Sequence, residues 1–224
     1  MPKASPWSDL WGGFFVGAYD PVPNFMMRPA HTTLHDHQIM ATSTRRILGL
    51  DPGKTNFGIG IVELPRGSNK PLVIANGILE CPLDNIKDRF RDGVSQFLVE
   101  VEEWVNEYNP SAIIAERFQS RGLMGTTVEM VGIMLGALCI HFIDMPMKVI
   151  TAASWKVPLQ KQTEKLDGVY KRCMTTPHQI DAVFQGCYGL EKGLNTKIQY
   201  DIDDIIRQTE ATSQEPLHKR KARK

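Results

Sequence analysis

Four side chains in this sequence combine residue types and positions that suit metal binding. Asp51 ends the apolar stretch 47–50, and Glu116 ends a second short apolar stretch later in the chain. His178 and Asp181 are three residues apart at the start of a predicted helix, so they share one helix face. A carboxylate at the end of a core strand is costly unless something pairs with it, and a metal ion or a phosphate group would be such a partner.

The apolar patterns along the chain place these residues on regular elements. Apolar residues that alternate with a period of two predict five strands, and those that recur every three or four residues predict five helices. The strands are expected at 46–51, 57–64, 72–79, 111–116 and 147–150, and the helices at 85–108, 126–143, 163–174, 177–190 and within 199–209. Thr176 is the expected N-cap of the helix that carries His178, with Pro177 in its first position.

This order of elements predicts an α/β fold of the ribonuclease H-like type, a mixed five-stranded sheet flanked by helices. In that order the first and fourth strands are neighbours, so Asp51 and Glu116 would meet at one edge of the sheet. Two carboxylates that close need a cation between them, and an oxygen-rich pair suits Mg²⁺ or Mn²⁺. Each residue also has a structural alternative: Asp51 as a turn residue, Glu116 as an ion-pair partner, His178 and Asp181 as polar residues of a helix start.

Composition divides the chain into three parts. Residues 1–44, rich in Pro, Gly, His and Met, are expected to be a poorly ordered extension. Residues 45–195 would form the α/β domain, and 196–224 a helix and a basic tail. The formal net charge is +1, but five of the 26 basic residues lie in residues 218–224. The rest of the chain therefore holds 21 basic and 25 acidic residues. Any polyanion binding would therefore use a local patch and the tail.

The chain contains no apolar run of the roughly 18 residues that a membrane helix needs. Its N-terminus also lacks the pattern of a signal peptide, since Asp9 and Gly12 interrupt the apolar residues there. We therefore expect a soluble intracellular protein without a membrane partner, in the cytoplasm or nucleoid, or in a host cell if a phage encodes it.

The chain resembles the RuvC family of Holliday-junction resolvases in three places: the stretch 47–58, the strand ending at Glu116, and the helix with His178 and Asp181. The resemblance covers roughly residues 45–190. It implies a homodimer that nicks four-way DNA junctions symmetrically by two-metal phosphodiester hydrolysis. The family's metal-site and catalytic roles fall on Asp51, Glu116, His178 and Asp181, with Asp51 bridging two ions. Many members carry Asp where this chain has His178. An imidazole is a softer ligand than a carboxylate, so His178 would favour Mn²⁺ over Mg²⁺.

The resemblance also implies DNA contacts. Phe118 is the candidate for stacking on a base, or else a partly buried anchor of its loop. Basic residues that could hold phosphates, or could simply be solvated, are Arg117, Arg121, Lys156, Lys161 and Lys165. The helix at 126–143 carries apolar residues on more than one face, which suggests contact with both the sheet and a second subunit, or a wholly internal core helix.

Three other functions fit parts of the pattern. Residues 51–56 also resemble the first phosphate loop of ATP-binding proteins of the actin and sugar-kinase type, although those proteins need a second such turn, which this chain lacks. A protein that binds junctions without cutting them would not need all four ligands. A broader nuclease for flaps, forks or other branched DNA stays open.

Overall fold

The computed structural model describes residues 45–53, 56–80, 86–117 and 126–214. The extension expected at 1–44, the candidates Phe118 and Arg121, and the basic tail therefore lie outside the described residues. Among the helices within the described ranges, none is both long enough and apolar enough to cross a membrane.

The core of the fold is a mixed sheet with the strand order β5-β4-β1-β2-β3-β6. Its strands are β1 (Arg45–Pro52), β2 (Asn56–Leu64), β3 (Leu72–Glu80), β4 (Ala112–Glu116), β5 (Met147–Ile150) and β6 (Ser213–Gln214). The first three strands pair antiparallel, whereas β4 pairs parallel with β1. The predicted neighbourhood of the first and fourth strands is confirmed. The sheet has one strand more than expected, because the two-residue β6 adds to β3.

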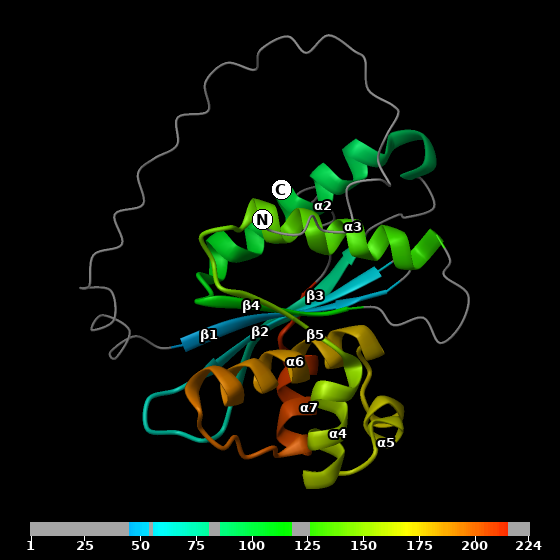
Figure 1. Cartoon of the computed structure of the whole chain (residues 1–224). Helices are drawn as coiled ribbons and strands as arrows, with labels where there is room; N and C mark the ends of the chain where they lie inside the picture. The colour runs from blue at the N-terminus through cyan, green and yellow to red at the C-terminus, as the bar shows by residue number, and fades with distance from the viewer. Residues whose placement is uncertain (1–44, 54–55, 81–85, 118–125, 215–224) are drawn as a thin grey trace, which may run out of the picture. The chain divides into compact units, whose positions relative to one another are not determined.

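Helices cover both faces of this sheet (Figure 1). One face carries α2 (Ile86–Tyr108) and α3 (Thr126–His141). The other carries α4 (Ala152–Gln162), α5 (Leu166–Arg172), α6 (Pro177–Leu194) and α7 (Ile202–Ala211). Of these, α6 lies directly against β1 and β2, so it is the helix closest to the end of β1.

The α4 helix was not predicted, and the helix expected at 163–174 is confined to 166–172. Pro158 lies inside α4, where it lacks the N–H that a helix interior uses, so the local sequence argues against a helix there. Trp155 and Leu159 are nevertheless buried in the core beneath α4. Tertiary packing therefore outweighs the local cost of the proline.

Strand alternation decides which face each site residue occupies. On β1, Leu48 and Leu50 belong to the core under α2 and α3, and Ile47 to the core under α6. Since side chains alternate along a strand, Asp51 lies on the α6 face with Ile47. Glu116 follows Ile114 by two residues and shares its face, again toward α6.

Candidate functional site

Asp51 lies near the end of β1 and is buried, with both carboxylate oxygens engaged by side chains of α6. Its Oδ1 accepts a hydrogen bond from Nε2 of Gln185 at 2.9 Å. Its Oδ2 lies 2.6 Å from Nδ1 of His178. The predicted proximity of Asp51 and His178 is therefore present, although 127 residues separate them.

Glu116 is the last residue of β4 and lies at the same sheet edge as Asp51. The parallel register pairs Leu50 with Ala115, which makes Asp51 and Glu116 the next residues along the two strands. The indole N–H of Trp155 donates to Oε2 of Glu116 at 2.7 Å. Burial is the main cause that raises the pKa of Glu116, and the nearby Asp51 carboxylate raises it further.

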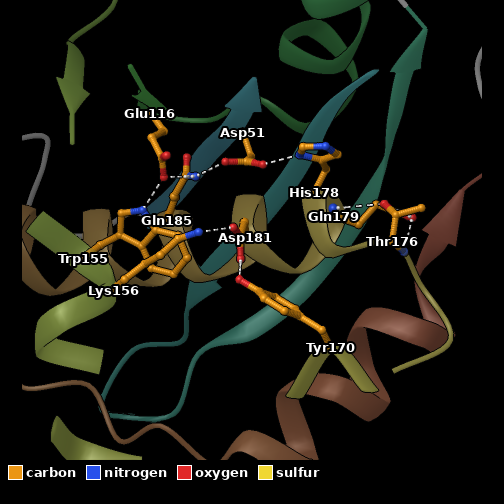
Figure 2. A network of polar contacts seen from close by, with 10 residues as sticks. All are labelled: Asp51, Glu116, Trp155, Lys156, Tyr170, Thr176, His178, Gln179, Asp181 and Gln185. Atoms are coloured by element: carbon orange, nitrogen blue, oxygen red, sulfur yellow. Dashed lines mark hydrogen bonds and ion pairs between the residues drawn. The ribbon is translucent and has the colours of Figure 1, made fainter. Parts of the chain in front are cut away.

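The α6 helix brings His178 and Asp181 to this edge from its first turn. Its start is fixed by a capping box, in which Thr176 accepts from the backbone N–H of Gln179 and the Gln179 side chain accepts from the backbone N–H of Thr176. The predicted N-cap and the proline in the first turn are both confirmed. Figure 2 shows His178 and Asp181 on the side of α6 that faces Asp51.

Two glycines of the sheet allow α6 to approach so closely. A Cβ added at Gly58 would lie 1.9 Å from the backbone oxygen of His178, and one added at Gly49 would lie 2.0 Å from that of Ala182. No side chain fits at either distance. Gly49 of β1 and Gly58 of β2 therefore determine how closely the start of α6, which carries His178 and Asp181, approaches Asp51.

Asp181 is buried and held by two donors from other helices. Nζ of Lys156, on α4, lies 2.6 Å from its Oδ2, and the hydroxyl of Tyr170, on α5, donates to its Oδ1 at 2.5 Å. Burial and the Asp51 charge raise the pKa of Asp181 to about 6, against the opposing effect of Lys156. Lys156 also lies over the ring of Trp155, 4.9 Å from its centroid.

The electrostatics of the site indicate an excess of negative charge. The contact with Asp51 is the largest influence on His178 and raises its pKa despite burial. Burial alone would lower the pKa of Lys156, yet Asp181 and the other two carboxylates outweigh it and raise that pKa. Cationic forms are thus stabilised and carboxylate ions are penalised. A divalent cation at this edge would relieve the same imbalance.

The donor set matches a hard divalent cation: three carboxylates and one imidazole at one edge of the sheet. Within the described ranges, however, no three His, Cys, Asp or Glu side chains are gathered tightly enough to form a ready-made metal site. Nitrogen and hydroxyl donors lie between them instead, so Asp51 connects to Glu116 through Gln185. Binding an ion would require Asp181 to exchange contacts with Lys156 or Tyr170 for contacts with the metal.

The predicted DNA-contacting residues differ in whether they contact the carboxylates of the site. Lys156 contacts the site directly, through Asp181. Arg117 is exposed immediately after Glu116, and its backbone N–H donates to Ile150. Lys161 lies exposed in the last turn of α4, and Lys165 is the exposed N-cap of α5. Of the three lysines, Lys156 is thus the one that the fold brings to the carboxylates.

Three side chains at the site were not among the predicted residues: Trp155, Tyr170 and Gln185. Gln185 carries a signal in the sequence, because it lies four residues after Asp181 and seven after His178, on the same helix face. Trp155 carries none, because α4 contains a proline and was not predicted, and Tyr170 lies on a predicted helix with no local pattern that relates it to the site.

A family model described as "Crossover junction endodeoxyribonuclease RuvC" matches residues 47–163, which is more than half of the chain. The chain belongs to the RuvC family. The matched segment contains Asp51, Glu116 and Lys156 and ends before α6, so the match itself does not reach His178 or Asp181. The resemblance stated from the sequence is thereby confirmed at the level of the family.

Curated RuvC proteins are similar over part of their length. The RuvC of Frankia alni is 33% identical over 120 residues, covering 50% of this chain and 55% of that protein. The RuvC of Parafrankia sp. is 37% identical over 86 residues, covering 36% of this chain and 46% of that protein. That of Corynebacterium efficiens is 30% identical over 93 residues, covering 40% of each. The chain thus matches about half, or less, of these RuvC relatives.

Solved RuvC structures share the fold. The Thermus thermophilus RuvC in complex with a Holliday junction substrate superposes with a TM-score of 0.55 at 19% identity, covering 68% of this chain and 97% of that one. A second T. thermophilus RuvC structure gives a TM-score of 0.54 at 18% identity, with 67% and 97% covered. The predicted α/β, ribonuclease H-like class is confirmed, with six strands in place of five.

Proposed function

We propose that this RuvC-family chain is a metal-dependent endonuclease that resolves four-way DNA junctions by paired symmetric nicks. The observation that carries the proposal is the convergence of Asp51 from β1, Glu116 from β4 and the His178–Asp181 turn of α6 on one sheet edge. Membership of the family favours this function over the ATP-binding alternative. An intact set of four candidate ligands favours cutting over binding alone.

The residues that would hold one or two Mg²⁺ or Mn²⁺ ions are Asp51, Glu116, His178 and Asp181. When bound, such ions supply activation of a water molecule and stabilisation of the leaving 3′ oxygen. Asp51 is the residue suited to bridge two ions, because it lies between Glu116 on one side and His178 on the other. His178 replaces a carboxylate with a softer neutral ligand, which supports a preference for Mn²⁺.

Lys156 is a basic side chain that already lies within the site. Its ammonium group is already 2.6 Å from Asp181, so releasing Asp181 to a metal would free Nζ to meet a DNA phosphate. Arg117, exposed beside Glu116, would add a second phosphate contact. These two residues would hold the scissile strand against the carboxylates, with Lys161, Lys165, Phe118 and Arg121 as further candidates.

Paired nicks require two sites, and α3 supplies a surface for a second subunit. Ile133 and Ile140 of α3 are 46% and 75% exposed, and Ile143, in the turn just after the helix, is 77% exposed. A Cβ at Gly132 or Gly136 would meet nothing within 4 Å, so a partner's side chains could approach the helix backbone there. Exposed apolar residues at this spacing support a homodimer through α3.

The decisive experiment is to incubate the purified protein with a synthetic four-way junction and, separately, with a flap, a fork and a linear duplex of matched sequence. The reactions contain Mg²⁺ or Mn²⁺, and the nicks are mapped on all strands. Symmetric nicks on opposite strands of the junction, with the duplex intact, would support the proposal. Equal cutting of flaps and forks would indicate the broader branched-DNA nuclease, and cutting of none of them would overturn the proposal.

A further inference from the structure

Gln185 lies at the centre of the site without being one of its candidate ligands. It is on α6, one turn after Asp181, and its side chain is completely buried. Its amide Nε2 lies 2.9 Å from Oδ1 of Asp51 and 3.4 Å from Oε2 of Glu116. Figure 2 shows the amide between the two carboxylates, joined to both by dashed lines.

Complete burial makes a polar side chain at position 185 costly unless it is hydrogen-bonded. Its neighbours along α6 include Val183, Phe184 and Cys187, which are buried in the core beneath the sheet. Its carbonyl oxygen Oε1 is buried without a hydrogen-bond partner among the described residues. A buried amide with only one end satisfied is unfavourable. The interaction of its other end with Asp51 and Glu116 is therefore what explains a glutamine at this position.

The orientation of the amide follows from the same contacts. Ionised carboxylates only accept hydrogen bonds, so the NH₂ group, and not Oε1, must face Asp51 and Glu116. An NH₂ group has two donors, one for each carboxylate. It also brings no charge, so the negative charge of the pair remains available to a cation. Lys156 differs, because it neutralises the carboxylate that it contacts, Asp181.

We propose that Gln185 is a positioning residue that bridges Asp51 and Glu116 in the metal-free protein and holds the pair at the spacing in which it receives a divalent cation. This inference rests on the metal site of the proposed function. It adds a neutral residue of α6 to the carboxylates and the imidazole that would ligate the ion. Without the bridge, two repelling carboxylates would separate and would have to be brought together again by the ion.

The first test measures binding of Mn²⁺ alone to the full chain by titration calorimetry. Gln185→Met keeps an unbranched side chain of similar length and removes the donor, and we expect the affinity to fall about tenfold or more. Gln208→Met is the matched control, since Gln208 on α7 bonds Asp204 and the backbone of Val73. The control should bind Mn²⁺ as the wild type does.

A second variant, Gln185→Glu, tests the bridge through repulsion, because it replaces the NH₂ donor with an acceptor that carries a negative charge. It preserves shape but places a third carboxylate beside Asp51 and Glu116. We expect the metal-free protein to melt at a lower temperature than the wild type, and Mn²⁺ to raise its melting temperature by more than it raises the wild type's. This measurement remains informative if the Gln185→Met protein does not fold.

The inference is overturned if folded Gln185→Met binds Mn²⁺ as tightly as the wild type, if the Gln208→Met control loses as much affinity, or if metal-free Gln185→Glu melts with the wild type. Failure of the proposed function gives a different result. In that case wild-type protein binds Mn²⁺ and Gln185→Met binds it more weakly, yet four-way junctions stay uncut. A wild type that binds no Mn²⁺ would overturn the metal site and the role of Gln185 together.

Discussion

His178 and Asp51 are joined by a contact of 2.6 Å between Nδ1 and Oδ2, across 127 residues of sequence. The contact links the first turn of α6 to the end of β1, which are the two elements that define the site. A histidine that is held by a carboxylate keeps a fixed ring orientation, and its second ring nitrogen is left to face a ligand. Under the proposed metal assignment, the same pair would influence both the stability of the metal-free protein and the choice of metal.

Removing the charge of Asp51 should abolish cleavage while leaving junction binding intact. Asp51→Asn keeps the shape of the side chain but loses the carboxylate that would bridge two ions. We expect cleavage of a four-way junction to fall by about a thousandfold or more, equivalent to ~4 kcal/mol of transition-state stabilisation. Gel-shift titration should give an affinity close to that of the wild type. The exposed Asp92 on α2 supplies the control Asp92→Asn, and normal cutting by Asp51→Asn would contradict the metal assignment.

Replacing His178 by aspartate should move the metal preference from Mn²⁺ toward Mg²⁺. An oxygen ligand is harder than an imidazole and raises the negative charge of the site by one, which suits Mg²⁺. The quantity to measure is the ratio of junction cleavage rates in the two metals at equal concentration. His141→Asn, on the last turn of α3, serves as the control. A ratio that does not change in His178→Asp would show that His178 does not choose the metal.

Filling the space at Gly58 should displace α6. A Cβ there would lie 1.9 Å from the backbone oxygen of His178, so the helix start must move away from β2. We expect Gly58→Ala to lose about 1–3 kcal/mol of unfolding free energy, or more, and to weaken Mn²⁺ binding. Gly193→Ala, on the same helix with nothing within 4 Å, should be neutral or slightly stabilising in urea denaturation. Equal stability of the two variants would argue against the close approach.

The metal-free protein should lose stability as pH rises from 5.5 to 8. Asp181 has a folded-state pKa of about 6, above its ordinary value of 3.8, so the folded state binds the proton more tightly and is penalised once that proton leaves. The raised pKa of His178 acts in the same direction, because its contribution is present at low pH and is lost as pH rises through the folded value. Asp181 alone accounts for about 1 kcal/mol over this window.

Urea denaturation in the presence of a chelator measures this dependence. Asp181→Asn removes one titrating group, so its stability should vary less with pH than that of the wild type. Added Mn²⁺ should reverse the trend, because metal ligands must be deprotonated. An Asp181→Asn protein with the wild-type pH dependence would refute the assignment of the effect to Asp181.

A charge on the exposed side of α3 should separate the proposed dimer. Ile140→Asp places a carboxylate at a residue that is 75% exposed in the single chain, so the fold should tolerate it. We expect light scattering to report a dimer for the wild type and a monomer for the variant, with unchanged circular dichroism. Val99→Asp, on α2 and 52% exposed, is the control that should remain dimeric. A dimeric Ile140→Asp protein would place the interface elsewhere.

Much of the fold follows from short-range pattern. The alternation of apolar residues in β1 and β2, the period of α2 and the cap of α6 at Thr176 are all local, because each depends on neighbours within one turn or one strand. One helix and one strand show the limit of such patterns. Pro158 concealed α4, which is held by the burial of Trp155 and Leu159, and the two-residue β6 has no local signal at all.

For the site, the sequence by itself determined the four candidate ligands, because strand ends and an i, i+3 helix spacing are written in local residue order. Only the tertiary structure decided which donors lie among them. Gln185 meets Asp51 across 134 residues, and Trp155 meets Glu116 across 39, once the glycines of β1 and β2 have let α6 settle on the sheet. Such contacts depend on how closely two elements pack, which residue order alone does not specify.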